Sequence, residues 1–154
     1  MKTPLEESRK ETINALQSII EKNYDAEKGY KKAMQDAENP ALRGFLQQQA
    51  AKRSHYATAI DQELRLLGEQ PKESGSVTGS LHRAWIDIKS TVAGNTDEAV
   101  LEEVIRGEKA SVEDYQEALR KPNLGPQINN VLQTQLNDIQ STLNKVKRLE
   151  DITS

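Results

Sequence analysis

Cysteine is absent from this sequence of 154 residues, and histidine occurs only twice, as His55 and His82. The lack of cysteine excludes disulfide bridges, thiolate catalysis and cysteine-ligated metals. Neither histidine belongs to a His-x-x-x-His or Glu-x-x-His pair, which argues against the common helical metal motifs. No Gly-x-Ser-x-Gly elbow, phosphate loop or Gly-x-Gly-x-x-Gly motif occurs. The sequence therefore lacks the usual signatures of nucleophilic catalysis and nucleotide binding.

Long apolar runs and an excess of one charge are also missing. No stretch approaches the roughly 20 apolar residues of a membrane span, and residues 1–7 lack the apolar core of a signal peptide. The 21 basic and 24 acidic residues are interleaved and leave a net charge of −3, so no basic patch suggests nucleic-acid binding. We expect a cytoplasmic protein with neither a membrane nor a nucleic acid as partner.

Helical periodicity is what the sequence does contain. Its few glycines and prolines divide the chain into four long segments that carry apolar residues at alternating spacings of three and four. Asn39 and Pro40 have the chemistry of a helix start, and Gly68 that of a helix end. No sustained period-two pattern predicts a strand. The predicted long helices cover residues 5–38, 39–67, 96–121 and 126–149.

The apolar spacing is typical of helices that cross at shallow angles in a bundle. We predict an all-α chain with one domain over residues 1–154, built as an antiparallel four-helix bundle. Two helical hairpins are joined by a long connection that carries a short extra helix over residues 80–93. The apolar stripe of this short helix, which includes Trp85, packs on the bundle or supplies a dimer surface.

Two glutamates, Glu27 and Glu108, interrupt the predicted apolar stripes of the first and third long helices. A buried carboxylate is costly unless it is paired, protonated or bound to a cation. One hypothesis is ion pairing, of Glu27 with Arg53 and of Glu108 with Lys52 or another base. A second is an iron or manganese site in which Glu27 and Glu108 are carboxylate ligands and His55 supplies a nitrogen. Solvent exposure of either glutamate is the third.

Three stretches of the sequence together resemble a known family. They are residues 24–30 (Tyr-Asp-Ala-Glu-Lys-Gly-Tyr), residues 79–85 (Gly-Ser-Leu-His-Arg-Ala-Trp) and residues 106–109 (Arg-Gly-Glu-Lys), the last followed by Tyr-Gln-Glu-Ala-Leu at 115–119. In this order they resemble DUF2383, a bacterial family of ferritin-like four-helix-bundle proteins of unknown function. The resemblance covers essentially the whole chain, and the Gly-x-Leu-His-Arg-x-Trp motif is its most specific part.

The resemblance implies a ferritin-like bundle in which Glu27 and Glu108 correspond to ligands on the first and third helices. A ferritin-type site also needs Glu-x-x-His on the second and fourth helices. This sequence offers Lys-Arg-Ser-His at 52–55 and Gln-Ser-Thr-Leu at 140–143, so lysine stands where the glutamate should be. Half of the ligand set is therefore missing.

We favour a non-enzymatic structural or interaction protein with a degenerate metal site, no resident cofactor, and a second copy or another protein as partner. The family resemblance adds an association with stress. The rival hypothesis is a carboxylate-bridged iron- or manganese-binding protein, for storage or oxidation, that uses Glu27 and Glu108. A pocket lined by tyrosines that binds a small ligand is a third hypothesis.

Overall fold

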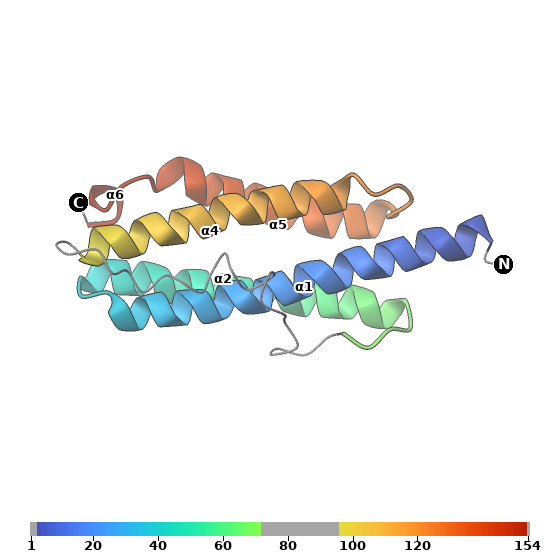
Figure 1. Cartoon of the computed structure of the whole chain (residues 1–154), viewed down its shortest axis with the longest axis horizontal. Helices are drawn as coiled ribbons and strands as arrows, with labels where there is room; N and C mark the ends of the chain where they lie inside the picture. Colours follow the sequence, from blue (N-terminus) through green and yellow to red (C-terminus); the bar gives the residue numbers. More distant parts are fainter. Residues whose placement is uncertain (1–2, 72–95, 154) are drawn as a thin grey trace.

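Four long helices lie side by side in the computed structural model, which describes residues 3–71 and 96–153 (Figure 1). They are α1 (Pro4–Asp36), α2 (Pro40–Leu66), α4 (Thr96–Leu119) and α5 (Pro126–Lys145), followed by the single turn α6 (Glu150–Thr153). The hairpin of α1 and α2 packs on the hairpin of α4 and α5, with α1 against α4 and α2 against α5. Neighbouring helices run antiparallel, and no strand occurs in the described ranges.

The predicted antiparallel bundle of two hairpins is therefore confirmed. The predicted short helix over residues 80–93, with His82 and Trp85, lies outside the described residues. No helix in the two described ranges is long and apolar enough to cross a membrane.

The helix ends follow the punctuation of the sequence. The Asn39 side chain accepts hydrogen bonds from the backbone N–H groups of Ala41 (2.8 Å) and Leu42 (3.2 Å), so it caps α2 as predicted. Gly68 has a φ of +80°, the left-handed conformation that ends a helix and that glycine adopts without strain. At the start of α1, the Thr3 hydroxyl accepts from the backbone N–H of Glu6 (3.1 Å).

The last long helix ends four residues earlier than predicted, at Lys145 rather than at residue 149. Val146 has an extended backbone (φ −117°, ψ 101°), and the N–H groups of Lys147 and Arg148 donate to the Asp151 carboxylate at 2.8 and 3.1 Å. These two backbone donors lower the pKa of Asp151. These two hydrogen bonds stabilise a turn that leads into α6. Leu149, in this turn, packs against the apolar core.

A carboxylate from the second hairpin closes the turn of the first. Asp97, in the first turn of α4, accepts from the backbone N–H groups of Glu38 (2.7 Å) and Asn39 (3.0 Å). At the opposite end of the bundle, the Asn123 amide donates to the Ser8 hydroxyl (3.1 Å). The first part of α1 and the turn that follows α1 are thus each bonded to the second hairpin.

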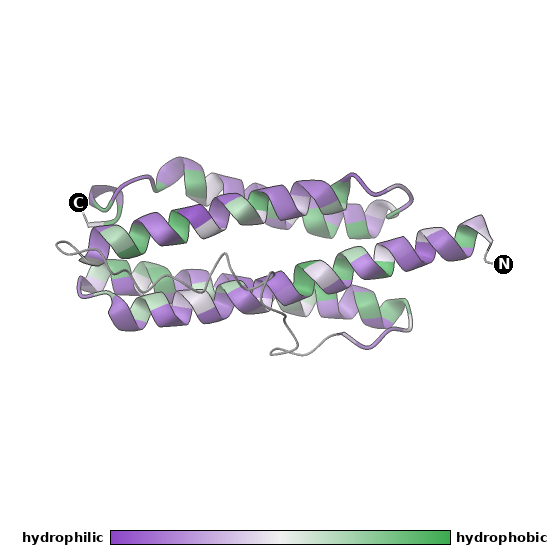
Figure 2. Cartoon of the chain, viewed as in Figure 1, coloured by the Kyte–Doolittle hydropathy of each residue, from purple (hydrophilic) through white to green (hydrophobic). Residues whose placement is uncertain are grey.

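Two apolar clusters fill the interior, and polar residues separate them. The turn cluster lies near the α1–α2 turn, and the loop cluster lies near the α4–α5 loop. The buried members of the turn cluster are Ala26, Tyr30, Ala33, Ala37, Leu42, Leu46, Ala50, Val100, Leu101 and Val104. Those of the loop cluster are Ala15, Leu16, Ile19, Ile20, Ala57, Ile60, Leu64, Tyr115, Ala118, Leu124, Ile128, Leu132, Leu136 and Ile139. In Figure 2, hydrophobic residues (green) and hydrophilic residues (purple) alternate along each long helix.

Candidate functional site at the centre of the bundle

Four polar side chains lie between the two clusters, and we call them the polar layer: Asn23 on α1, Arg53 on α2, and Glu108 and Ser111 on α4. All four are buried. At the centre, Arg53 Nη2 lies 2.5 Å from Glu108 Oε1, and both side chains are only 3% exposed. A full ion pair is therefore buried between the two apolar clusters.

The Arg53 guanidinium connects three helices. It donates from Nη2 to Glu108 Oε1 and to Ser111 Oγ (2.9 Å), and from Nη1 to Asn23 Oδ1 (2.9 Å). Burial by itself lowers the pKa of Arg53, but the negative charge of Glu108 opposes this, and the pKa ends above its ordinary value. Arg53 is therefore a permanent cation, which the interior accommodates through an opposite charge and hydrogen-bond acceptors.

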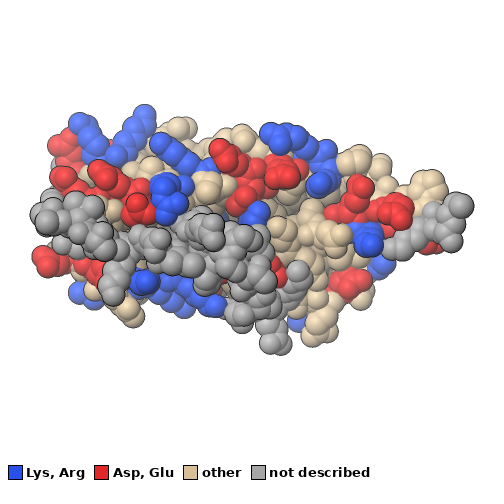
Figure 3. Space-filling model, viewed as in Figure 1, with Lys and Arg blue, Asp and Glu red and all other residues tan. Residues whose placement is uncertain are grey.

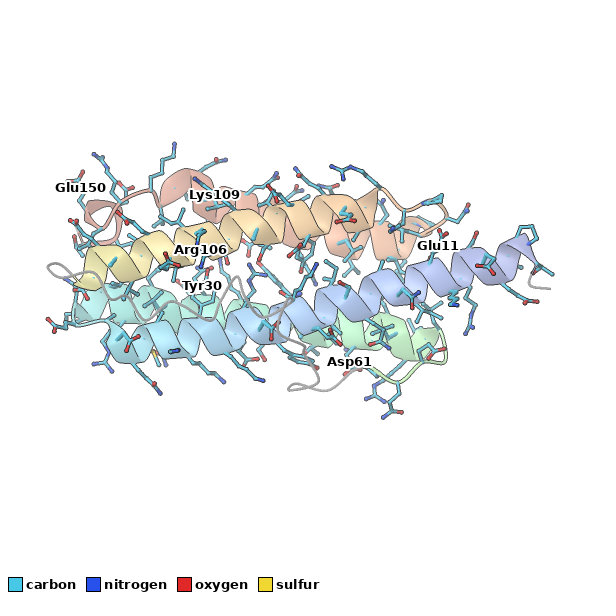
Figure 4. All side chains as sticks on the ribbon, viewed as in Figure 1. Glu11, Tyr30, Asp61, Arg106, Lys109 and Glu150 are labelled. Atoms are coloured by element: carbon cyan, nitrogen blue, oxygen red, sulfur yellow. The ribbon has the colours of Figure 1, made fainter. Side chains whose placement is uncertain are left out.

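Two buried tyrosines extend the network on either side of this pair. Tyr30 donates from its hydroxyl to Glu108 Oε1 (2.5 Å), and Figure 4 labels this residue where α1 and α4 face each other. The Tyr115 hydroxyl accepts from Asn23 Nδ2 (2.8 Å) and donates to Gln135 Oε1 (2.6 Å), which brings α5 into the network. Burial raises the pKa of Tyr115 to about 12 and raises that of Tyr30 as well. Both hydroxyls therefore keep their protons at neutral pH.

A second carboxylate lies at the edge of the bundle, between α2 and α5. Tyr56 donates from its hydroxyl to Asp138, and Lys52 Nζ lies 3.5 Å from the same carboxylate. Partial burial, followed by the bond to Asp138, raises the pKa of Tyr56 above its ordinary value. Gln135 links this edge to the centre, because its Nε2 donates to the backbone carbonyl of Tyr56 (3.2 Å).

Glu27 and Glu108, which both interrupt a predicted apolar stripe, lie in different environments in the structure. Glu108 is buried and pairs with Arg53, whereas Lys52 pairs with Asp138. Glu27 is 22% exposed and pairs with Lys31 (2.9 Å), so the predicted pair of Glu27 with Arg53 is wrong. The cause is the spacing on α1, since steps of three and four after Asn23 reach either Ala26 or Glu27. The fold buries Ala26.

The third candidate ligand, His55, is exposed. The buried face of α2 passes through Arg53 and Ala57, which directs residue 55 outward. Over residues 3–71 and 96–153, no three histidine, aspartate or glutamate side chains gather in a way that could hold a metal ion. Glu27, Glu108 and His55 are therefore not brought together.

The network contains a repeated spacing that the apolar stripes of the sequence do not reveal. Asn23 and Tyr30 on α1 are seven residues apart, as are Glu108 and Tyr115 on α4. Arg53 and Tyr56 on α2 are three apart, as are Gln135 and Asp138 on α5. The sequence carries one signal of this repeat, because residues 30–34 (Tyr-Lys-Lys-Ala-Met) resemble residues 115–119 (Tyr-Gln-Glu-Ala-Leu). Two more buried carboxylates, Glu21 and Asp25, also lie outside the predicted stripe of α1.

These repeated positions have the arrangement of a dimetal bundle, which takes one glutamate from each of two helices and an i, i+3 pair from each of the other two. The residue types do not fit two metal ions. The six positions that correspond to ligands are Asn23, Arg53, Tyr56, Glu108, Gln135 and Asp138. Only Glu108 and Asp138 are carboxylates; Glu108 is bonded to Arg53, and Asp138 is bonded to Tyr56 and Lys52. A guanidinium beside the central carboxylate would repel a metal ion.

The molecular surface gives weaker indications of a binding site than the centre of the bundle does. Figure 3 shows lysine and arginine mixed with aspartate and glutamate over the face in view. Three surface grooves over the described residues have no tyrosine in their walls. Three of the four tyrosines, Tyr30, Tyr56 and Tyr115, have their hydroxyls in the network instead.

Comparisons with known proteins agree with the fold. A family model described as "Domain of unknown function (DUF2383)" matches residues 11–121. A solved structure of a Dps1 mutant from Mycobacterium smegmatis is 17% identical, with a TM-score of 0.75 over 89% of this chain and 93% of that one. A ferritin-like, diiron-carboxylate protein from Bacillus anthracis str. Ames is 15% identical, with a TM-score of 0.70 over the same shares. No curated protein is significantly similar in sequence. The bundle therefore has the predicted ferritin-like fold.

Proposed function

Because the chain belongs to the DUF2383 family of unknown function, we propose a role from its own residues: a non-enzymatic structural or interaction protein with an ion pair in place of a metal. The observation that carries the proposal is the buried pair of Arg53 and Glu108. In a bundle built for metal chemistry, this central position would hold ligands around a cation. Here it holds a cationic side chain.

The polar layer supports a role in specifying the fold. Buried polar networks restrict a core to one arrangement, because any shift of a helix leaves a charged or polar group without its partner. The bonds of Arg53 reach α1 and α4, and Tyr115 connects α4 to α1 and α5. Register along all four helices is therefore tied to one network.

The same bonds argue against catalysis at the centre. A general base needs a pKa near neutrality and access to a substrate. The Glu108 carboxylate is buried and accepts from Tyr30 and Arg53, and burial raises the pKa values of Tyr30 and Tyr115 away from neutrality. The hydrogen bonds of these groups are made to one another, which leaves them poorly suited to act on a substrate.

A carboxylate-bridged iron or manganese protein is the competing candidate. The diiron-carboxylate description of the Bacillus anthracis structure favours it. The pairing of Glu27 with Lys31 and the exposure of His55 favour the ion-pair proposal. The cytoplasmic location, the association with stress and the single-domain organisation stay predictions from the sequence.

Elemental analysis tests the proposal directly. The protein is purified anaerobically, incubated with ferrous iron or with manganese, passed through a desalting column and analysed. We expect less than one metal ion per chain, and no difference between the wild type and the Glu108→Gln and Glu27→Gln variants. Near-stoichiometric metal that is lost in Glu108→Gln would overturn the proposal in favour of the metal protein.

The interaction half of the proposal predicts self-association, because long bundles present extended side faces to a second copy. Sedimentation velocity over a range of protein concentrations measures it. We expect a dimer at the higher concentrations. A monomer throughout would contradict the homodimer and leave only a different protein as partner, to be sought by cross-linking in cells.

A further inference from the structure

The central guanidinium stands at one of the repeated positions of the bundle. Arg53 and Tyr56 on α2 correspond in spacing to Gln135 and Asp138 on α5. In a dimetal bundle, the first member of each such pair is a carboxylate that faces the metal ions. Arg53 thus replaces an anionic ligand by a cation, and the side chain extends into the space between the helices.

The net charge of the central ion pair is already zero. Glu108 contributes one negative charge, and Arg53 contributes one positive charge at 2.5 Å. At the edge, Asp138 and Lys52 form a second neutral pair. Two divalent ions bring four positive charges and need several carboxylates around them. Adding such ions to a neutral site would leave an uncompensated charge in the interior.

Oxygen atoms surround the guanidinium in the way that they surround a bound cation. Its hydrogen bonds include those to Glu108 Oε1, Asn23 Oδ1 and Ser111 Oγ, which belong to three different side chains. The Tyr30 hydroxyl lies against the same Glu108 oxygen. These oxygens come from α1 and α4, and the cation comes from α2.

We infer that the Arg53 guanidinium is the resident cation of the position that dimetal bundles fill with metal, and that its removal opens this position to a small free cation. The inference rests on the proposed function in placing an ion pair at the centre. It adds that the surrounding oxygens form a cation site in their own right.

Chemical rescue tests the inference. Arg53→Ala removes the cation and leaves a cavity beside the Glu108 carboxylate. Guanidinium chloride at low millimolar concentration, too dilute to denature, supplies the missing group as a free ion. We expect it to raise the Tm of Arg53→Ala by about 2–4 °C, because a ligand that binds only the folded state stabilises it. The Tm of the wild type should not rise.

Three controls identify the site. Urea has the shape of guanidinium without its charge, and it should leave the Tm of Arg53→Ala unchanged. The double variant Arg53→Ala/Glu108→Gln lacks the anion and should lose the rescue. Arg53→Met fills the cavity with an apolar side chain and should also show none. Arg53→Met further provides a soluble reference if Arg53→Ala is poorly folded without guanidinium.

A metal arm uses Arg53→Glu, which restores a carboxylate at this position and keeps Glu108. With manganese chloride as the probe, we expect its Tm to rise and manganese to remain bound after desalting, whereas the wild type shows neither. If Arg53→Ala folds but guanidinium does not raise its Tm, and Arg53→Glu does not bind manganese, the inference is wrong. Metal bound by the wild type itself would instead contradict the proposed function, so the two failures are distinguishable.

Discussion

The centre of the bundle and the outer edge of α1 hold the same residue type in two different physical situations. Glu108 is buried against Arg53 and Tyr30, whereas Glu27 is 22% exposed and bonded to Lys31 one turn away. The Glu108 carboxylate lies in a low-dielectric interior, where a missing partner is costly, and the Glu27 carboxylate lies in contact with water, which can replace a partner. Burial, more than the presence of an ion pair, therefore decides how much a carboxylate contributes to the stability of this fold.

Removal of the central negative charge should destabilise the protein most. Glu108→Gln keeps the shape of the side chain but leaves the Arg53 guanidinium without its counter-charge in the core. Breaking one partner of a buried pair destabilises a protein by about 3–5 kcal/mol. Chemical denaturation of the variant and the wild type measures this difference. A loss no greater than that of a surface substitution would mean that burial does not distinguish Glu108 from Glu27.

The double variant Arg53→Met/Glu108→Leu is the matched control for that experiment. It removes both charges and fills the space with apolar side chains of similar volume. Such replacements are often neutral or stabilising. We therefore expect the double variant to be more stable than Glu108→Gln. A double variant as unstable as the single one would mean that the hydrogen bonds of Asn23 and Ser111, rather than the ion pair, dominate.

The stability at alkaline pH should depend on the buried tyrosines at the centre of the bundle. An exposed tyrosine ionises near pH 10 in both the folded and the unfolded state and does not change the stability. Burial raises the pKa of Tyr115 to about 12. Protonated Tyr115 therefore contributes to the free energy of unfolding fully below pH 10. This contribution falls by about 2–3 kcal/mol as the pH rises toward 12. Denaturation curves at several alkaline pH values, with tyrosinate absorbance followed in parallel, test this. Tyr115→Phe should make the pH dependence shallower.

Asp97 provides an intermediate case that separates hydrogen bonding from burial. It is half-buried, and its carboxylate accepts from two backbone N–H groups in the α1–α2 turn. Asp97→Ala removes both acceptors, and we expect a loss of about 1–2 kcal/mol, as for other capping side chains. Asp97→Asn keeps one acceptor oxygen and should lose less. Equal losses for the two variants would point to charge alone.

Glu27→Ala should have the smallest effect. Partly exposed ion pairs one helical turn apart contribute about 0.3–0.5 kcal/mol and are screened by salt. The loss should shrink further when denaturation is repeated at high ionic strength, which leaves the Glu108→Gln difference nearly unchanged because that pair is buried. A loss for Glu27→Ala comparable with that of Glu108→Gln would mean that Glu27 has a role which its contact with Lys31 does not explain.

The fold was predictable because it depends on periodicity, which a sequence displays openly. The spacing of apolar residues predicted four helices, and Asn39 and Gly68 predicted the limits of α2 correctly. The end of α5 was not predictable from spacing, since the apolar pattern continues through Val146 and Leu149. The chain turns there because the Asp151 carboxylate binds two backbone N–H groups.

The site was predictable only in part. The buried position of Glu108 followed from its stripe, but steps of three and four could not choose between Ala26 and Glu27. The partner of Glu108 was open for the same reason, because Lys52 and Arg53 are neighbours and one residue of rotation exchanges them. The pairs Arg53 with Tyr56 and Gln135 with Asp138 contain no histidine, so a search for metal motifs passes over them. Three-dimensional packing supplies the rotation of each helix that the sequence leaves open.

The Asp97 contact also makes the first hairpin dependent on the second. The amide protons of Glu38 and Asn39 are bonded to a carboxylate that arrives almost sixty residues later in the chain. Hydrogen exchange at these two amides therefore reports the docking of one hairpin on the other, rather than the fraying of a local turn. During synthesis, the turn of the first hairpin emerges well before the group that closes it. Its protection should consequently appear only when α4 has docked, in a single cooperative step with the formation of the polar layer.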